Sequence, residues 1–356
     1  MRSASWTVGR VTTAAVLTAL AALLGACGGG DDSNAGTNAN AAAAAPAMIA
    51  AESQAPRRIA LAYDRKGVSS LVVSPDGMTV AVANSDGRVR LLDPSGAVAA
   101  KVLKPAGSVV TAGLIFTGDR RYLVTVGRDS VAQVWKVDTG DVRFTLRGHE
   151  HALRSITASA DGSLIATGGE ETRVMLWDGA TGRLKRVFTG HSDFVNSVSL
   201  SGDGRWLASG DAAARVLVWN VASGQLLHTL RGHANEVNAV AFSPDGRLIA
   251  STGEDGKALL WDTASGAQVG ALESSGGPMR SLAFSSDGAL IAGGTADGRV
   301  LVWNAVTHKI SEQLAGPGGA VNALAFDVRN PKQLFVGDGD NGKGVMVMRM
   351  SGDATR

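Results

Sequence analysis

Short apolar stretches separated by turn residues recur along most of the chain, and the region after position 236 shows the pattern clearly. From Val237 to Phe242, apolar residues alternate with polar or small ones, and a Pro-Asp-Gly turn follows. Further apolar runs occupy residues 248–251, 258–261 and 269–272, with turn residues between them. Runs of this length bounded by turn residues indicate β-strands. The pattern therefore predicts a unit of four short antiparallel strands in this region.

Three series of residues share one spacing of about 42 residues, so the four-strand unit is itself repeated. The span 57–350 holds 294 residues, which seven such units would fill. Tryptophans recur at this interval at Trp135, Trp177, Trp219, Trp261 and Trp303. Gly-His pairs end with the same spacing at His149, His191 and His233. Asp-Gly turns share it at Asp161, Asp203, Asp245 and Asp287.

The order Gly-His, Ser-Pro-Asp-Gly, Asp and Trp-Asp within one unit resembles the WD-repeat family of β-propellers. Five units carry the tryptophan, whereas Leu92 and the region near Val347 stand in its place in the first and last units. The resemblance implies an all-β fold, a seven-bladed propeller of four-stranded antiparallel blades. It also implies that an N-terminal strand over Arg57–Tyr63 joins the last blade and closes the ring, which removes two open sheet edges.

The resemblance further implies a buried network of His, Ser or Thr, an acid and Trp that holds a blade together. One unit has Ala213 where the acid belongs, so its network is expected to be incomplete. Restoring the acid with Ala213→Asp is then expected to add about 1 kcal/mol of stability, the contribution of a typical hydrogen bond. The expected members are His149, Thr167, Glu171 and Trp177; His191, Ser209 and Trp219; His233, Ser251, Asp255 and Trp261; and, without the histidine, Thr125, Asp129 and Trp135, and Asp297 and Trp303.

The same residue types also form the catalytic triad of hydrolases. A nucleophile site is normally built once, whereas these sets recur in successive units together with a tryptophan that packs. We therefore expect a structural role and no catalytic residues. His151, His228 and His308 lack the spacing of metal ligands, and no phosphate-binding loop is present, so neither a metal nor a cofactor is predicted.

Function is then expected on the loops at one end of the ring. The resemblance implies that protein partners dock around the central channel, on the face where the first strand of each unit begins. Four residues are the expected anchors, because aromatic residues and Arg dominate interface hot spots: Arg128, Arg154, Phe194 and Arg280. The remaining residues of the expected face are Asn196, Glu236, Asn238, Glu254 and Asn322.

The leading hypothesis is accordingly a monomeric, non-enzymatic scaffold that binds protein partners. Two alternatives stay open. The central channel could instead bind a small ligand or house an enzyme site, as in other propeller families, which would require a cluster of carboxylates and histidines at its mouth. A purely structural role in a cell envelope is the third hypothesis.

The N-terminal residues predict an export signal and a membrane anchor. Residues 1–26 contain two arginines and no acid, and their apolar run of 14 residues is shorter than the roughly 20 that a transmembrane helix needs. The sequence Leu-Gly-Ala-Cys that ends at Cys27 resembles the lipobox of bacterial lipoproteins, which implies cleavage before Cys27 and lipidation of its thiol. Residues 27–56 are expected to form a flexible tether of about 30 Å, and residues 351–356 a short tail.

Composition, charge and the residue after Cys27 limit the classes of partner and the cellular location that are expected. The 34 basic and 32 acidic residues give a net charge of +2, and loss of residues 1–26 removes both excess arginines, so no nucleic-acid binding is predicted. The one cysteine excludes an intramolecular disulfide. The resemblance to lipoproteins implies a bacterial cell envelope. Gly28 rather than aspartate after the cysteine favours the periplasmic face of an outer membrane, if the host has one.

Overall fold

The computed structural model describes residues 57–59, 67–95, 101–104, 111–272, 277–339 and 344–350. The predicted signal peptide, Cys27, the tether and the C-terminal tail therefore lie outside the described residues. No helix in the described ranges is both long and apolar enough to cross a membrane.

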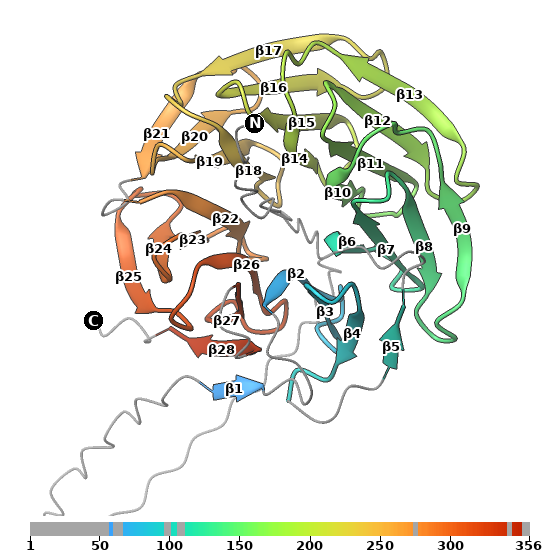
Figure 1. Cartoon of the computed structure of the whole chain (residues 1–356). Helices are drawn as coiled ribbons and strands as arrows, with labels where there is room; N and C mark the ends of the chain where they lie inside the picture. Colours follow the sequence, from blue (N-terminus) through green and yellow to red (C-terminus); the bar gives the residue numbers. More distant parts are fainter. Residues whose placement is uncertain are drawn as a thin grey trace, which may run out of the picture.

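The described strands form seven four-stranded antiparallel sheets arranged as the blades of a ring (Figure 1). Blade 1 contains β2 (Val68–Val73), β3 (Val80–Asn84), β4 (Val89–Leu92) and β5 (Lys101–Leu103). Blade 2 contains β6 (Thr111–Phe116), β7 (Tyr122–Gly127), β8 (Ala132–Lys136) and β9 (Val142–Leu146). Blade 3 contains β10 (Leu153–Ala158), β11 (Leu164–Gly169), β12 (Arg173–Asp178) and β13 (Leu184–Thr189).

The remaining blades repeat this order. Blade 4 contains β14 (Val195–Leu200), β15 (Trp206–Asp211), β16 (Arg215–Asn220) and β17 (Leu226–Arg231). Blade 5 contains β18 (Val237–Phe242), β19 (Leu248–Gly253), β20 (Ala258–Asp262) and β21 (Gln268–Leu272). Blade 6 contains β22 (Met279–Phe284), β23 (Leu290–Thr295), β24 (Arg299–Asn304) and β25 (Ile310–Ala315). Blade 7 contains β26 (Val321–Phe326), β27 (Gln333–Asp338), β28 (Val345–Arg349) and β1 (Arg57–Ile59).

Blade 7 is built from both ends of the described chain. Strand β1 pairs antiparallel with β28, with Arg57 opposite Val347 and Ile59 opposite Val345. The first described strand thus becomes the outermost strand of the last blade (Figure 1). The seven blades and the closure by an N-terminal strand confirm the fold that the sequence resemblance implied.

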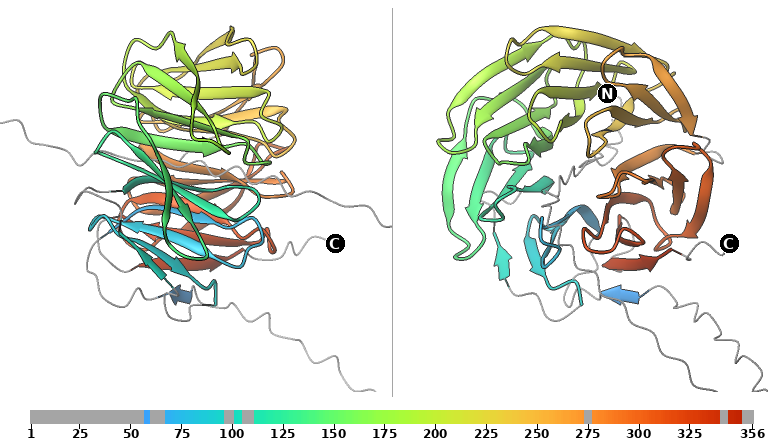
Figure 2. Two further views of the ribbon diagram at one scale, coloured as in Figure 1. Left: turned by 90° about the vertical axis from the view of Figure 1, so that its right-hand side faces the viewer. Right: turned by 180° about the vertical axis from the view of Figure 1, so that it is seen from behind.

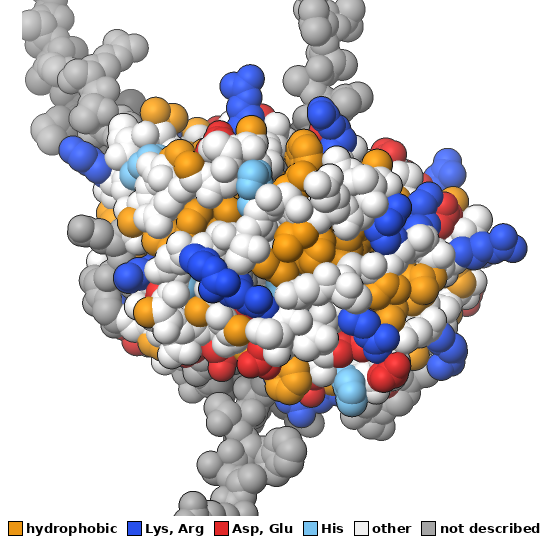
Figure 3. Space-filling model, turned by 90° about the horizontal axis from the view of Figure 1, so that it is seen from above, with side chains coloured by type: hydrophobic (Ala, Val, Ile, Leu, Met, Phe, Trp, Pro, Cys, Tyr) orange, Lys and Arg blue, Asp and Glu red, His pale blue; other side chains and the backbone are white. Residues whose placement is uncertain are grey.

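Each blade runs outward from its first strand, which faces the centre of the ring, to its fourth strand on the rim (Figure 2). Strand β14 is buried along its whole length, whereas Leu230 is the buried residue of β17. The rim therefore exposes apolar as well as basic side chains, as Figure 3 shows from the side of β17. A β-bulge interrupts the pairing of β16 with β17, which makes this outer edge a poorer template for adding another strand.

Glycines in the second strands allow neighbouring blades to approach closely. A Cβ atom added at Gly210 would lie 2.5 Å from Cγ1 of Val237, and one added at Gly168 would lie 2.7 Å from Cγ1 of Val195. The same relation joins Gly294 to Val321 and Gly337 to Val68. The valine that starts the first strand of one blade thus packs on a glycine of the blade before it.

The antiparallel order gives the ring two different ends. We call the end where the first strand of each blade begins the loop face, and the other end the opposite face. Turns on the opposite face are closed by short side-chain bonds: the Ser243 hydroxyl donates to Asp245 Oδ1 at 2.6 Å, and Gly246 has a φ of +71°. Gly77, Gly162, Gly204 and Gly288 have a positive φ at the same place in the turns of other blades.

Candidate interaction face

The loop face contains the predicted polar networks, and in blade 5 the network is complete. Trp261 Nε1 donates to Ser251 Oγ at 2.9 Å, and Ser251 Oγ lies 2.8 Å from His233 Nε2. His233 Nδ1 lies 3.0 Å from Asp255 Oδ1. A neutral histidine with its proton on Nδ1 satisfies this chain, because it accepts from the serine and donates to the carboxylate.

Blade 3 has the same network with Glu171 in place of the aspartate. Trp177 Nε1 donates to Thr167 Oγ1 at 2.8 Å, Thr167 Oγ1 lies 2.6 Å from His149 Nε2, and His149 Nδ1 bonds to Glu171. His149 and Glu171 are both buried, and Arg173 adds an ion pair to Glu171 at 2.8 Å. The predicted networks of blades 3 and 5 are therefore each formed by side-chain bonds within their own blade.

In blade 4 the network is also complete, so the predicted gap at Ala213 is wrong. His191 Nδ1 lies 2.8 Å from Asp211 Oδ2, and His191 Nε2 lies 2.6 Å from Ser209 Oγ, which accepts from Trp219 Nε1 at 3.0 Å. Asp211 ends strand β15, two residues before the loop position that the repeat pattern assigns to the acid. The carboxylate therefore reaches the histidine from the end of the strand rather than from the loop.

The blades without the histidine keep parts of the arrangement. In blade 2, Trp135 Nε1 donates to Thr125 Oγ1 at 3.0 Å, and burial raises the pKa of Asp129. In blade 6, Asp297 pairs with Arg299, whose Nε lies 2.9 Å away, while Trp303 is fully buried. These tryptophans are thus buried in their blades even where no histidine completes the hydrogen-bond network.

Burial decides the protonation of the networks. It is the largest cause that lowers the pKa of His149 and His233, against the opposing effects of Glu171 and Asp255. Burial alone would raise the pKa of Glu171, but hydrogen bonds from His149 and Arg173 hold that pKa below its ordinary value. Hydrogen bonds from Ala234 and His233 do the same for Asp255. Each pair therefore combines a neutral histidine with an ionised carboxylate near pH 7.

Lowering the pH from 7 to 5 is expected to destabilise the propeller. Because the pKa of His149 and His233 lies below the unperturbed 6.5 in the folded chain, the unfolded chain takes up protons first. Stability is then full above about pH 6.5 and falls below it by at most about 1.4 kcal/mol per pH unit for each histidine. The depressed pKa values of Glu171 and Asp255 add a second loss at lower pH, below the ordinary carboxylate range.

Urea unfolding followed by tryptophan fluorescence at several pH values measures this dependence. The variant with His149→Gln and His233→Gln is the control, because it should lose most of the slope between pH 7 and 5. A wild-type free energy of unfolding that stays constant over this range contradicts the assignment of neutral histidines.

In blades 3 to 6, the second residue of the first strand links the blade to the next one. Arg154 Nη1 donates to Asn196 Oδ1 at 2.6 Å, and Asn196 Nδ2 donates to the Val237 carbonyl at 3.2 Å. Asn238 Nδ2 donates to the Met279 carbonyl at 2.8 Å. Asn196 and Asn238 are each only 4% exposed, so the prediction that they lie on an accessible face is wrong. Their amides hold the ring together, since the next blade packs against them.

Two of the predicted arginine anchors, Arg154 and Arg280, take part in the same hydrogen bonds between blades. Arg154 contacts Glu170 at 3.1 Å in addition to Asn196, and its side chain is 18% exposed. Arg280 Nη1 donates to Asn322 Oδ1 at 3.3 Å, and both residues are partly exposed. Arg128 is exposed. Of the predicted arginine anchors, Arg128 is therefore the one the structure places on the surface.

Phe194 is exposed and yet held in place. Its side chain is 42% exposed, and the Arg154 guanidinium lies 5.2 Å from the ring centroid. Its N–H donates to Asp193 Oδ1 at 2.8 Å, and its carbonyl accepts from the Ala212 N–H at 2.9 Å. An exposed aromatic ring with its backbone held on both sides is suited to binding, because little conformational entropy remains to be lost.

The two predicted acids of blade 5 lie close to each other. Glu236 and Glu254 are both partly exposed, and the Glu254 N–H donates to the Glu236 carbonyl at 2.9 Å. Glu254 also accepts a bond from Asn238 Nδ2 at 2.9 Å. The loop face thus brings Phe194, Glu236 and Glu254 together on blades 4 and 5, while the two asparagines lie beneath it.

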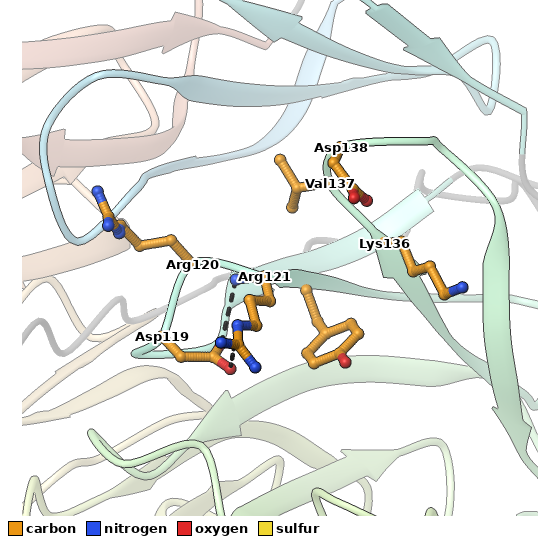
Figure 4. Close-up of a pocket in the computed structure, with 7 residues that line it drawn as sticks. Asp119, Arg120, Arg121, Lys136, Val137 and Asp138 are labelled. Atoms are coloured by element: carbon orange, nitrogen blue, oxygen red, sulfur yellow. Dashed lines mark hydrogen bonds and ion pairs between the residues drawn. The ribbon is translucent and has the colours of Figure 1, made fainter.

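A cavity of about 580 Å³ opens on the opposite face, in the turns of blade 2 (Figure 4). It lies away from the centre of the ring, where the alternative hypothesis expects a ligand. Two of its cations are paired with carboxylates: Arg120 with Asp76 at 2.7 Å, and Arg121 with Asp119 at 4.0 Å. Its lining is Asp119, Arg120, Arg121, Tyr122, Lys136, Val137 and Asp138. Within the described ranges, no three His, Cys, Asp or Glu side chains are placed to hold a metal ion.

Hydroxyl groups of the first strands form a second set of links that the sequence reasoning missed. The Val198 N–H donates to Ser155 Oγ at 3.0 Å, and the Val240 N–H donates to Ser197 Oγ at 3.1 Å. These serines are fully buried and point at the backbone of the next blade. A small hydroxyl residue recurring at one position of successive first strands is the signal that could have revealed them.

Comparison with known families gives one match. The family model for the WD domain, G-beta repeat, matches residues 61–93, 140–178, 182–220, 224–262 and 266–304, together more than half of the chain. No curated protein matches the chain significantly. Each matched segment ends with or just after the third strand of a blade; four of these strands contain the tryptophan, and the first contains Leu92 in its place.

Proposed function

Because the chain belongs to the WD-repeat family of β-propellers, we propose that it is a membrane-tethered platform that binds a protein partner on its loop face. Propellers of this family generally bind protein partners and are typically non-enzymatic scaffolds. The observation that carries the proposal is Phe194, an exposed aromatic ring whose position is determined by Arg154, Asp193 and Ala212. Rigid, exposed aromatic residues are typical centres of protein interfaces.

Partner recovery from native membranes tests the loop face. Phe194→Ala is expected to weaken binding by about 2 kcal/mol or more, the range of an interface hot spot. Val306→Ala is the matched control, because Val306 is an apolar side chain that is 83% exposed on the opposite face. Proteins cross-linked to the wild type and to the control but not to Phe194→Ala would support the proposal. Equal recovery by all three chains would contradict it.

The tether is the second part of the proposal. It is supported by the apolar run before Cys27 and by the Leu-Gly-Ala-Cys sequence that ends there. Several acyl chains on one residue, each contributing about 0.8 kcal/mol per buried CH₂, would hold the propeller at the membrane of a bacterial envelope. In a host with two membranes, Gly28 after the cysteine favours the periplasmic face of the outer membrane. Cys27→Ser should move the protein from the membrane fraction to the soluble fraction, and its persistence in the membrane would contradict the anchor.

A further inference from the structure

Blade 4 carries an unusual loop between its second and third strands. Residues 212–214 are all alanine, whereas the corresponding residues of blades 3 and 5 begin Glu170-Glu171 and Glu254-Asp255. The blade nevertheless keeps its network, because Asp211 supplies the carboxylate from the end of β15, where it is fully buried. At this blade the network acid therefore comes from the end of the second strand instead of from the loop, and it keeps its bond to His191.

The alanine loop lies against Phe194. The Ala212 N–H donates to the Phe194 carbonyl at 2.9 Å, and Ala213 is exposed. This backbone bond joins the two loops, and we call their three apolar residues the Phe194 patch: Phe194, Ala212 and Ala213. Arg215, the arginine that follows the alanine loop, is directed toward the buried Asp211 by its bonds to Asp211 Oδ2 at 2.8 Å and 3.0 Å.

Carboxylates from both neighbouring blades flank the patch. On the blade 3 side, the Val195 N–H donates to the Glu171 carbonyl at 3.3 Å, which places the adjacent Glu170 beside Phe194. On the blade 5 side, Val237 packs on Gly210, which places the adjacent Glu236 beside the alanine loop. Asp193 precedes Phe194 directly.

The charges around the patch are unbalanced. Glu170, Glu236, Glu254 and Asp193 bring four carboxylates, and Arg154, stacked on the Phe194 ring, pairs with Glu170. An apolar centre with a negative surround disfavours an acidic partner and attracts a basic one, because interfaces pair complementary potentials.

We propose that the Phe194 patch receives a partner segment with an apolar side chain flanked by Lys or Arg. This inference rests on the proposed function and specifies its partner. The apolar side chain covers the Phe194 ring and the alanine methyl groups, while the flanking cations approach Glu170 and Glu236. Alanine at positions 212 and 213 keeps the centre of the patch uncharged, whereas blades 3 and 5 have the partly exposed Glu170 and Glu254 at the position of Ala212.

Selection of a random peptide display library on the full chain tests the chemistry of the partner. The enriched peptides are expected to contain an aliphatic or aromatic residue within two positions of Lys or Arg. A synthetic peptide from the selection should bind at least ten-fold more weakly to Phe194→Ala and to Ala213→Lys, and less tightly as salt is raised. Ala213→Gln, which lengthens the same exposed side chain without charge, and Val306→Ala should bind within two-fold of the wild type.

Thermal melting of each variant separates loss of binding from loss of fold, and Phe194→Leu, which keeps an apolar side chain, should retain most of the affinity. Enriched peptides that are acidic, or that bind Phe194→Ala and Ala213→Lys as tightly as the wild type, would overturn the inference. If such peptides lose binding on substitution of Arg128 instead, the loop face remains the interaction surface and only the patch is excluded. Peptides insensitive to every loop-face substitution would overturn the proposed function as well.

Discussion

Asp211→Ala is expected to lower the free energy of unfolding by about 3–5 kcal/mol, because it removes the acceptor of a buried polar network. The carboxylate is fully buried, pairs with His191 Nδ1 at 2.8 Å and accepts two bonds from the Arg215 guanidinium. It also accepts the backbone N–H groups of Ala213 and Arg215. Arg215 can turn to water once the acid is gone, but His191 remains buried with its Nδ1 unsatisfied.

Urea unfolding of wild type and variant gives this loss directly from the shift in midpoint. Ala213→Asp is the informative control, since the sequence pattern alone expects it to stabilise the protein by completing a network. The structure predicts a change within about 0.5 kcal/mol, because the network is complete and residue 213 is exposed. A clear gain from Ala213→Asp, or an Asp211→Ala loss below about 1 kcal/mol, would contradict the role of Asp211.

Gly210→Thr is expected to cost about 3 kcal/mol, at the upper end of the range for inserting atoms into a packed core. The added Cβ would lie 2.5 Å from Cγ1 of Val237 and 3.1 Å from Cγ1 of Val240, both in the fully buried strand β18. Blade 5 shows how a threonine is accommodated at this position of the second strand. There Thr252 stands at the position of Gly210, and the following blade begins with Met279 instead of a valine. An unbranched methionine side chain adapts to irregular space more easily than a valine.

A double-mutant cycle with Val237→Ala identifies the clash as the cause. Val237→Ala alone removes buried methyl groups and costs stability, yet in combination with Gly210→Thr it makes room for the new side chain. The double variant is therefore expected to be more stable than the sum of the single effects predicts. Gly277→Ala is the matched control, because a Cβ added there meets no atom within 4 Å. Strictly additive effects would exclude contact between the two blades at this point.

Much of the fold could be read from the repeat. The 42-residue spacing of Trp135, Trp177, Trp219, Trp261 and Trp303 divides the span 57–350 into seven blades, and the expected strand beginning at Arg57 closes the ring as β1. These features depend on local strand and turn preferences that recur in every unit. The strands of a degenerate unit can therefore be assigned by aligning it with a unit whose pattern is clear. The networks of His149 and His233 were predictable from the resemblance to the WD-repeat family, whose motif residues these two units match.

The site was less predictable, because exposure depends on the neighbouring blade. Asn196 and Asn238 occupy loop-face positions in the repeat, but the first strand of the next blade covers them and takes their amide bonds. Asp211 was missed because the repeat assigns the acid to the loop, while the geometry at the end of β15 lets a residue two positions earlier reach His191.

The sequence by itself determined the number of blades and their short strands through its periodic pattern of strands and turns. Its resemblance to the WD-repeat family added the ring closure and the residue types of the networks. Tertiary structure alone decided which polar residues reach the surface, where the blade 4 acid lies and that Phe194 stands among alanines with carboxylates on either side. These properties arise where the backbones of separate blades approach each other, and no single repeat contains that information.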